Sequence, residues 1–412
     1  MKKTVTLLII IFFAVVSTAS AVFQEEPEKA EKREIPKGKD YFLNLSLCHP
    51  VSINKTREDR VNINLSLIYG HVGYISGFDL SLLASAATHK MTGVQISGLT
   101  AVTGESGSGM QLSGLITVAG EEFTGFQAGG LICVSGEKFK GWQSSGLMNV
   151  IGESGSGFQA AGLANVAGER YSGVQIGGGF NVIGERGSGG QISGLFNVCG
   201  EDFEGVQISG LFNVTGEDFK GLQVGPINVA VENHGVQLGV ANLQQNSDGL
   251  QLGIVNYTKK ENTGIPIGLV NLAENGRIKG IFWGGNQVAV TGGVKFLIGG
   301  RYYSIVSLGG YNLDDDIAAS FSYGFHYGLR FPIRKFNLNT DIGFRYRDNK
   351  PLFKQNDKER DQWLFEARLS LGIPVSNNLS FLVGTGYSRR WNTVESVEKQ
   401  GRALIFAGLE IY

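Results

Sequence analysis

A histidine, an aspartate and two serines are the residues of this chain best placed to do chemistry. His326 and Asp341 fall on the polar faces of two neighbouring segments that alternate in polarity, and Ser320 or Ser322 lies near them. A serine activated by a histidine, itself oriented by a carboxylate, is the arrangement used for nucleophilic hydrolysis. The competing interpretation is a polar barrel interior in which such groups satisfy one another. We favour this second interpretation and expect no enzymatic activity.

A recurring glutamate raises the question of metal binding. It directly follows a glycine in eight units, at positions 105, 121, 137, 153, 169, 185, 201 and 217. Calcium takes roughly six to eight oxygen ligands, usually from several carboxylates and carbonyls. One glutamate per unit is too few, and none of the five histidines stands in a metal-ligand motif. We therefore expect solvated turns, with no metal and no cofactor.

The segments that would position the candidate residues read as strands of a membrane barrel. In 319–331 and 336–346, apolar and aromatic residues occupy one face, and serine, glycine and charged residues occupy the other. This alternation, with an aromatic-rich outer face, is typical of transmembrane β-barrels. Short connections, such as 332–335, alternate with long charged ones, such as 347–361. Residues 277–412 are therefore predicted to form an antiparallel outer-membrane barrel of about eight strands.

Six titratable residues are assigned to the interior of this barrel because they lie on the polar faces of its strands. They are His326, Arg330, Asp341, Arg345, Glu366 and Arg368. Glu410 departs from the pattern. It shares a face of the final strand with Leu404, Phe406 and Tyr412, and that face is expected to point outward and to be apolar.

A phrase of 16 residues repeats through much of residues 93–276. Each unit opens on a glycine, with a glutamine two positions later and, in most units, an asparagine further on. Glycine spaced regularly among Val, Ile, Phe and Asn predicts many short strands with tight corners. Stacked units would place equivalent amides above one another as hydrogen-bonded ladders. The predicted ladder residues are Gln175, Gln191, Gln207, Gln223, Asn181, Asn197, Asn213 and Asn228.

The spacing from glutamine to asparagine bears on how the repeats fold. It is six residues in the long units, as from Gln207 to Asn213, and five in the short ones, as from Gln237 to Asn242. In one continuous strand this difference would turn the asparagine to the opposite face. A corner at Gly210, between two short strands, removes the conflict. We therefore favour stacked Gly-rich β repeats, as a solenoid or hairpin stack. The alternative is one larger barrel that includes the repeats as strands.

The N-terminal residues predict export. Residues 1–21 hold two lysines, an apolar run and a small-residue cleavage site, which indicate a signal peptide. Residues 22–40 are charged and poor in apolar residues, so a flexible tail is expected, and strand-like runs follow in 41–92. A net charge of -1 offers a nucleic acid no attraction.

Three cysteines are too few for a disulfide framework in an exported chain, and their number is odd. Cys133 stands where neighbouring units carry asparagine, and Cys199 is expected in a turn. Because these two occupy different repeat positions, stacking would not bring them together.

The repeats resemble those of a bacterial surface-repeat family found in exported proteins of Gram-negative cells. The resemblance lies in "GLQVGPINVA", "GVQLGVANL", "GLQLGIVNY" and "GIPIGLVNL", preceded by "NLSLCHPVSIN" and "VNINLSLIYG" and followed by a barrel-like region. It implies tandem Gly-x-Gln-x-Gly…Asn units and this layout over nearly all of 41–412. The longer units at 93–220 depart from the family pattern. The resemblance implies no catalytic residue.

These observations predict a non-enzymatic protein of the outer membrane of a Gram-negative bacterium. The barrel would anchor the chain in outer-membrane lipid. The repeats would present a regular surface with a structural or interaction role at the envelope or cell surface, for a partner that the sequence does not name. The alternative function is a porin-like channel for small solutes, formed by a larger barrel that includes the repeats.

Overall fold

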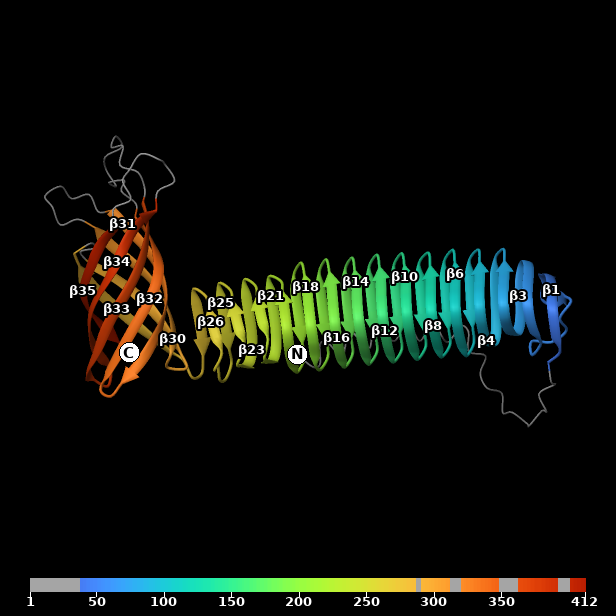
Figure 1. Ribbon diagram of the computed structural model, residues 1–412, viewed down its shortest axis with the longest axis horizontal. Coiled ribbons are helices and arrows are strands. Elements are labelled where there is room, and N and C mark those ends of the chain that lie inside the picture. Colours follow the sequence, from blue (N-terminus) through green and yellow to red (C-terminus); the bar gives the residue numbers. More distant parts are fainter. Residues whose placement is uncertain (1–37, 287–289, 312–319, 348–361, 392–400) are drawn as a thin grey trace, which may run out of the picture. The chain divides into compact units, whose positions relative to one another are not determined.

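The computed structural model describes residues 38–286, 290–311, 320–347, 362–391 and 401–412, and all regular structure in them is β (Figure 1). In this part of the chain no helix is long and apolar enough to cross a membrane. The predicted signal peptide, nearly all of the predicted tail and the longer predicted loops of the barrel lie outside the described residues. The chain forms a β-solenoid followed by a closed antiparallel β-barrel, which confirms the predicted fold class.

Two strands build each long coil of the solenoid. β10 (Lys138–Ser145) is followed by a corner and the shorter β11 (Met148–Ile151), and a polar turn leads on to β12 (Ser154–Ala161). β10 and β12 pair in parallel with equivalent residues opposite each other, as Gln143 is opposite Gln159. Parallel pairing between successive units excludes the antiparallel larger barrel, so that alternative is wrong.

The other strands of the long coils follow the same pattern. They are β4 (Ala84–Ser97), β5 (Thr100–Thr103), β6 (Ser106–Ser113), β7 (Ile116–Ala119), β8 (Glu122–Gly129), β9 (Ile132–Ser135), β13 (Ala164–Ala167), β14 (Arg170–Gly177), β15 (Phe180–Ile183), β16 (Arg186–Ser193), β17 (Phe196–Cys199), β18 (Phe203–Ser209) and β19 (Phe212–Thr215). Gly210 lies in the corner between β18 and β19, as the glutamine-to-asparagine spacing predicts.

The glycine that opens each long unit lies close to the backbone of the preceding coil. Gly141 has a φ of 132°, which other residues rarely adopt, and a Cβ there would press on the carbonyl oxygen of Gly125. We expect Gly141→Ala to lower the free energy of unfolding by about 1–3 kcal/mol, measured by urea denaturation of the full chain in detergent. Gly190 is the matched control, because a Cβ there would meet Val174 only at 3.8 Å. Equal losses in Gly141→Ala and Gly190→Ala would contradict this explanation.

The N-terminal strands join the same parallel pattern and are closed by a cap. β1 (Asp40–Cys48) pairs in parallel with β3 (Arg60–Ser81), which pairs in parallel with β4. β2 (Val51–Ser52) returns antiparallel to β1. Beyond it, the backbone N–H of Asn54 donates to the side-chain oxygen of Asn44 at 2.9 Å. The cap covers an edge that would otherwise be open to pairing with another chain.

The coils shorten near residue 220, where the chain also divides into two compact units, the second beginning at Lys220. In the short coils Gln237 pairs with Gln223 on one side and Gln251 on the other. The strands are β20 (Asp218–Val224), β21 (Ile227–Asn233), β22 (Val236–Leu238), β23 (Ala241–Ser247), β24 (Leu250–Leu252), β25 (Val255–Thr258), β26 (Ile265–Ile267) and β27 (Val270–Ala273).

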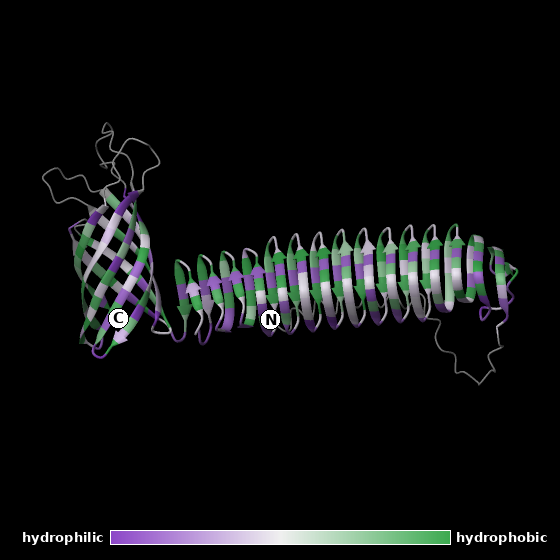
Figure 2. Cartoon of the chain, in the orientation of Figure 1, coloured by the Kyte–Doolittle hydropathy of each residue, from purple (hydrophilic) through white to green (hydrophobic). Residues whose placement is uncertain are grey.

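Eight antiparallel strands close the C-terminal barrel, as predicted. Apolar and polar residues alternate along them, as the colours of Figure 2 show. Phe321 and Phe344 are exposed on the outside, while Ser322 and Arg345 are buried within. The strands are β28 (Arg277–Gly285), β29 (Val290–Ile298), β30 (Tyr302–Tyr311), β31 (Ser320–Ile333), β32 (Phe336–Arg347), β33 (Gln362–Ser376), β34 (Leu379–Trp391) and β35 (Gly401–Ile411).

The inward and outward faces of β35 are the reverse of the predicted ones. Leu404, Phe406 and Glu410 are buried, whereas Ile405 and Ile411 are exposed on the outside. The prediction failed because part of the barrel interior is itself apolar, so hydrophobicity alone does not mark the outer face. The buried apolar cluster consists of Ile281, Trp283, Leu297, Tyr303, Ile305, Leu382 and Phe406.

The last coil of the solenoid packs on the outer face of β30. Ser304 alternates with the inward-facing Tyr303, yet it is fully buried because β27 covers it. Asn271 Nδ2 donates to Ser304 Oγ at 3.0 Å, and Ser304 Oγ donates to the carbonyl oxygen of Leu269 at 3.2 Å. The barrel therefore closes the C-terminal edge of the short coils.

Candidate functional site

The repeated glutamines form a directional ladder inside the solenoid. Gln191 Nε2 donates to Gln175 Oε1 at 2.9 Å, and Gln207 Nε2 donates to Gln191 Oε1 at 2.8 Å. In the short coils Gln237 Nε2 donates to Gln223 Oε1 at 2.8 Å. All four of the predicted ladder glutamines are buried, and the amide N–H groups point toward the N-terminal end of the chain.

The asparagines form a second ladder that runs in the opposite direction. Asn181 Nδ2 donates to Asn197 Oδ1 at 2.9 Å, and Asn197 Nδ2 donates to Asn213 Oδ1 at 3.0 Å. In the short coils Asn228 Nδ2 donates to Asn242 Oδ1 at 3.0 Å. Each of these donors also reaches a backbone carbonyl of the following coil, at 2.8 or 2.9 Å. The amide dipoles of the two ladders therefore point in opposite directions. Buried hydrogen-bond networks in which each member has a partner also favour a single register of the coils.

An interior asparagine of the ladder should contribute more to the free energy of unfolding than the first asparagine. Asn181 accepts from Asn165 and donates to Asn197, whereas Asn149 Oδ1 has no partner because Cys133 precedes it in the column. We expect Asn181→Thr to lower the free energy of unfolding by about 2 kcal/mol and Asn149→Thr by about 1 kcal/mol, since one more hydrogen bond is lost. Urea titrations of both variants test this. Equal losses would show that side-chain volume, not the ladder, sets the cost.

A single carboxyl group stands where two runs of amides meet. Asp79 occupies the glutamine column, opposite Gln95. On one side Asn64 Nδ2 donates to Asp79 Oδ1 at 2.7 Å. On the other side the Ser85 hydroxyl donates to Asp79 Oδ2, and Gln95 Nε2 donates to Ser85 Oγ at 2.9 Å. Complete burial raises the pKa of Asp79 to about 6, although these hydrogen bonds act to lower it.

The candidate hydrolytic residues are buried in the barrel but are not brought together as a catalytic group. His326 Nε2 lies 2.8 Å from Glu366 Oε2, and Arg345 Nε donates to Glu366 Oε1 at 2.9 Å. The Ser322 hydroxyl accepts from Arg345 Nη1 at 3.3 Å, so its partner is the arginine. The side chain of Ser320 lies outside the description. The histidine is held by a hydrogen bond with Glu366 rather than set against a nucleophile.

Asp341 takes part in a separate pair. Arg368 Nε donates to Asp341 Oδ1 at 2.6 Å, and the Tyr303 hydroxyl donates to Asp341 Oδ2 at 2.8 Å. The last of the six assigned residues, Arg330, is also buried, with its Nη1 3.7 Å from Glu410 Oε1. Ion pairs therefore involve five of the six side chains assigned to the interior from the sequence, and the sixth, His326, is hydrogen-bonded with Glu366.

A triad that was not predicted from the sequence lies beside these pairs. Lys279 Nζ lies 2.5 Å from Glu410 Oε1, and Lys295 Nζ lies 2.9 Å from Glu410 Oε2. All three side chains are almost fully buried. The lysines escaped notice because the inward faces of β28 and β29 also carry apolar residues, such as Trp283 and Leu297. The glutamate at position 410, on a face expected to be apolar, was the one feature of the sequence that could have indicated buried lysines.

These side chains pack against one another between the described strands of the barrel. A cavity of about 10 Å³ remains among Trp283, Lys295, Tyr303 and Arg368. A water molecule needs at least roughly 10–15 Å³ of such space, and eight-stranded barrels are generally just wide enough for their own side chains to fill. The described interior is a packed core with buried ion pairs.

The polar residues outside the barrel do not assemble a metal site either. Among the residues that the structure describes, no group of three or more His, Cys, Asp or Glu side chains could hold a metal ion. Cys48, Cys133 and Cys199 are free. Cys199 ends β17 and is buried, so its predicted place in a turn is wrong. Burial raises the pKa of Cys133 to about 11 and that of Cys199 to about 12, which makes both thiols poor nucleophiles.

Comparison with known proteins adds one weak likeness. No family model matches the chain, and no curated protein matches it. A crystal structure of the N-terminal β-barrel domain of Pseudomonas aeruginosa OprF aligns with 33% of this chain and 96% of its own length, at 11% sequence identity and a TM-score of 0.26. A TM-score this low supports no conclusion about this chain.

Proposed function

We propose that this chain is a non-enzymatic outer-membrane protein whose barrel is a lipid-embedded anchor and whose solenoid is a scaffold on the periplasmic side. The observation that carries the proposal is the barrel's inverted polarity. Large apolar side chains such as Phe321, Ile342 and Phe344 are 46–57% exposed on the outside, while Arg345 and Glu366 are buried inside. A barrel with this polarity is stable where apolar solvent surrounds it.

The filled interior favours an anchor over a channel. The channel alternative needed a larger barrel built with the repeats, and the repeats instead form parallel coils. Within the eight described strands, Glu410 on β35 lies 2.9 Å from Lys295 on β29 and 3.7 Å from Arg330 on β31, so these buried pairs cross the interior. Conduction would require these pairs to separate, and breaking a buried pair is strongly unfavourable.

The short turns support a periplasmic solenoid. Two-residue turns at 334–335 and 377–378 and a three-residue turn at 299–301 connect strands at one end of the barrel. β28 begins at this end, because Arg277 is paired with Leu297, just before the 299–301 turn. Outer-membrane barrels keep their short turns in the periplasm. The chain therefore enters the barrel from the periplasmic side, and the coil before it packs at the same end.

Fractionation of a Gram-negative host that expresses the full chain tests the anchor. We expect the protein in the outer membrane, released by detergent but not by high salt, and migrating faster in SDS gels when unheated. A chain that stays soluble without detergent would refute the proposal. In planar bilayers the purified protein should give no unitary conductance, and steady channel openings would favour the channel instead.

A further inference from the structure

One edge of the solenoid is apolar along its length. The residue after the corner glycine of each long coil is a leucine in most units, and these leucines are 39–49% exposed. They are Leu99, Leu115, Leu131, Leu147, Leu163, Leu195 and Leu211, and Leu83 precedes them at the same corner. No Asp, Glu, Lys or Arg stands within two positions of any of them. A contiguous apolar surface of this kind marks a site of association rather than an ordinary solvated edge.

The opposite edge carries the charge. It is formed by the polar turns, each of which holds a glutamate after the glycine, such as Glu137 and Glu153, often with a basic residue beside it. Figure 2 shows hydrophobic colour along one edge of the coils and hydrophilic colour gathered along the other. The segregation is the β-solenoid equivalent of an amphipathic helix, whose apolar side lies in a membrane interface while its charged side stays in water.

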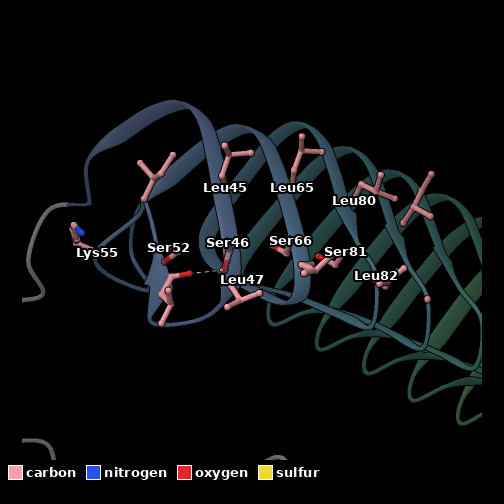
Figure 3. A pocket seen from close by; sticks show the side chains of 16 residues that line it. Leu45, Ser46, Leu47, Ser52, Lys55, Leu65, Ser66, Leu80, Ser81 and Leu82 are labelled. Atoms are coloured by element: carbon pink, nitrogen blue, oxygen red, sulfur yellow. Dashed lines mark hydrogen bonds between the residues drawn. The ribbon is translucent and has the colours of Figure 1, made fainter.

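The apolar edge is grooved at its N-terminal end. A hollow of about 1230 Å³ runs between rows of leucines, with a floor of serines (Figure 3). The labelled leucines are Leu45, Leu47, Leu65, Leu80 and Leu82, and the serines are Ser46, Ser52, Ser66 and Ser81. A second hollow of about 710 Å³ continues along the edge over Gly98, Gly114, Gly130 and Gly146. Lys55 is the one charged residue that lines the first hollow, and no charged residue lines the second. Grooves whose walls are so largely apolar suit acyl chains better than acidic peptides.

The last short coil, which belongs to the same compact unit as the barrel, has an equivalent corner. Leu269 is the corner residue of the last coil, and it contacts Ser304, the third residue of β30. Further along β30, the outward-facing Val306 and Leu308 are 39% and 58% exposed. The polar turn at the other edge of the same coil, here called its polar corner, leads into β28 at Arg277. Arg277 lies at the end of the barrel that carries the short turns. In this last coil the apolar corner therefore lies nearer the barrel's lipid-facing surface, and the polar corner lies nearer the periplasm.

We propose that the apolar edge of the solenoid rests on the phospholipid leaflet of the outer membrane, with its leucines in the acyl region and its glutamate edge in the periplasm. This inference rests on the proposed function. It names phospholipid as the occupant because the corner leucines have no charged neighbour in sequence, because the grooves are acyl-sized with Lys55 as their one charged lining residue, and because the equivalent corner of the last short coil, at Leu269, adjoins the lipid-facing surface of the barrel. A second copy of the chain and a protein partner are the other possible occupants.

Fluorescence quenching in vesicles tests the contact. The full chain, with Cys48→Ser to remove its one partly exposed thiol, is labelled with a polarity-sensitive fluorophore at Leu147→Cys, at Glu153→Cys or at Phe344→Cys. Leu147 and Glu153 lie on opposite edges of one coil, and Phe344 is on the outside of the barrel. The vesicles contain phosphatidylethanolamine and phosphatidylglycerol, with a quencher attached to the acyl chains.

We expect at least twofold stronger quenching at Leu147 than at Glu153, with strong quenching at Phe344. Quenching at Phe344 with none at Leu147 would overturn the lipid contact and leave the anchor standing. Absence of quenching at both would refute the anchor itself. A Leu147 label shielded from aqueous iodide but not quenched from the lipid would assign the edge to a second copy or a protein partner, and would also overturn the inference. The variant Leu163→Glu should reduce quenching at Leu147 while unheated gel mobility stays unchanged.

Discussion

Glu410→Ala should lower the free energy of unfolding of the barrel by about 3–5 kcal/mol, because it leaves two buried ammonium groups without their counter-ion. Lys279 Nζ and Lys295 Nζ lie 2.5 and 2.9 Å from the two oxygens of this carboxylate, and neither lysine has access to water. The measurement is the urea midpoint of the purified protein in detergent. Unfolding is monitored by the change in the gel mobility of unheated samples.

The control for Glu410 is an exposed pair in the solenoid. Lys138 Nζ lies 2.8 Å from Glu122 Oε1, and both side chains are more than half exposed. Glu122→Ala should leave the urea midpoint close to that of the wild type, since water screens such pairs. Glu410→Gln keeps the side-chain volume but removes the charge, so it should still cost most of the effect of Glu410→Ala. A loss below about 1 kcal/mol in Glu410→Ala would contradict the assigned role of the triad.

Stability of the N-terminal coils should fall as the pH rises from about 4 to about 6. Asp79 has its pKa raised from 3.8 to about 6 by burial, so between these values the folded chain holds a proton that the unfolded chain has released. Folding is therefore favoured by this group at low pH, and the advantage is lost as the pH rises through the folded pKa. The difference corresponds to about 3 kcal/mol across that window.

Urea titrations from pH 4 to pH 8 measure the effect. Asp79→Asn removes the titrating group. The stability of this variant should therefore fall less than that of the wild type over the same pH window. Glu169→Gln is the matched control, because it removes a partly exposed carboxylate of a polar turn and should keep the wild-type slope. A wild-type stability that rises with pH between about 4 and 6 would contradict the raised pKa.

The solenoid was predictable because its period is set by the chain itself. Units of equal length stack only in register, so the burial of Gln191 above Gln175 follows from the spacing. The direction of the ladders was not predictable. Each amide carries both a donor and an acceptor, and the sequence does not say which way it points. The sequence also did not predict that two runs of hydrogen-bonded side chains meet at Asp79. That follows from the hydrogen bonds that Asn64 and Ser85 donate to its carboxylate.

The barrel interior was predictable only where its two faces contrast. In β31 and β32 aromatic residues alternate with polar ones, so Asp341 and Arg345 could be assigned to the interior. In β28 and β35 both faces are apolar in part, so the inward Glu410 was read as an outward residue. The apolar edge was also missed, because a corner leucine such as Leu147 reads equally well as core or surface until the turn of the coil is known.

Thiol labelling on living cells tests the central claim, that a sealed outer-membrane barrel holds the solenoid on its periplasmic side. Lys260 is an exposed residue of a short coil, near the barrel in sequence. A chain with Cys48→Ser and Lys260→Cys is treated with a membrane-impermeant maleimide before and after the outer membrane is permeabilised. We expect no labelling of intact cells and full labelling after permeabilisation. Labelling of intact cells would place the solenoid on the cell surface and contradict the claim.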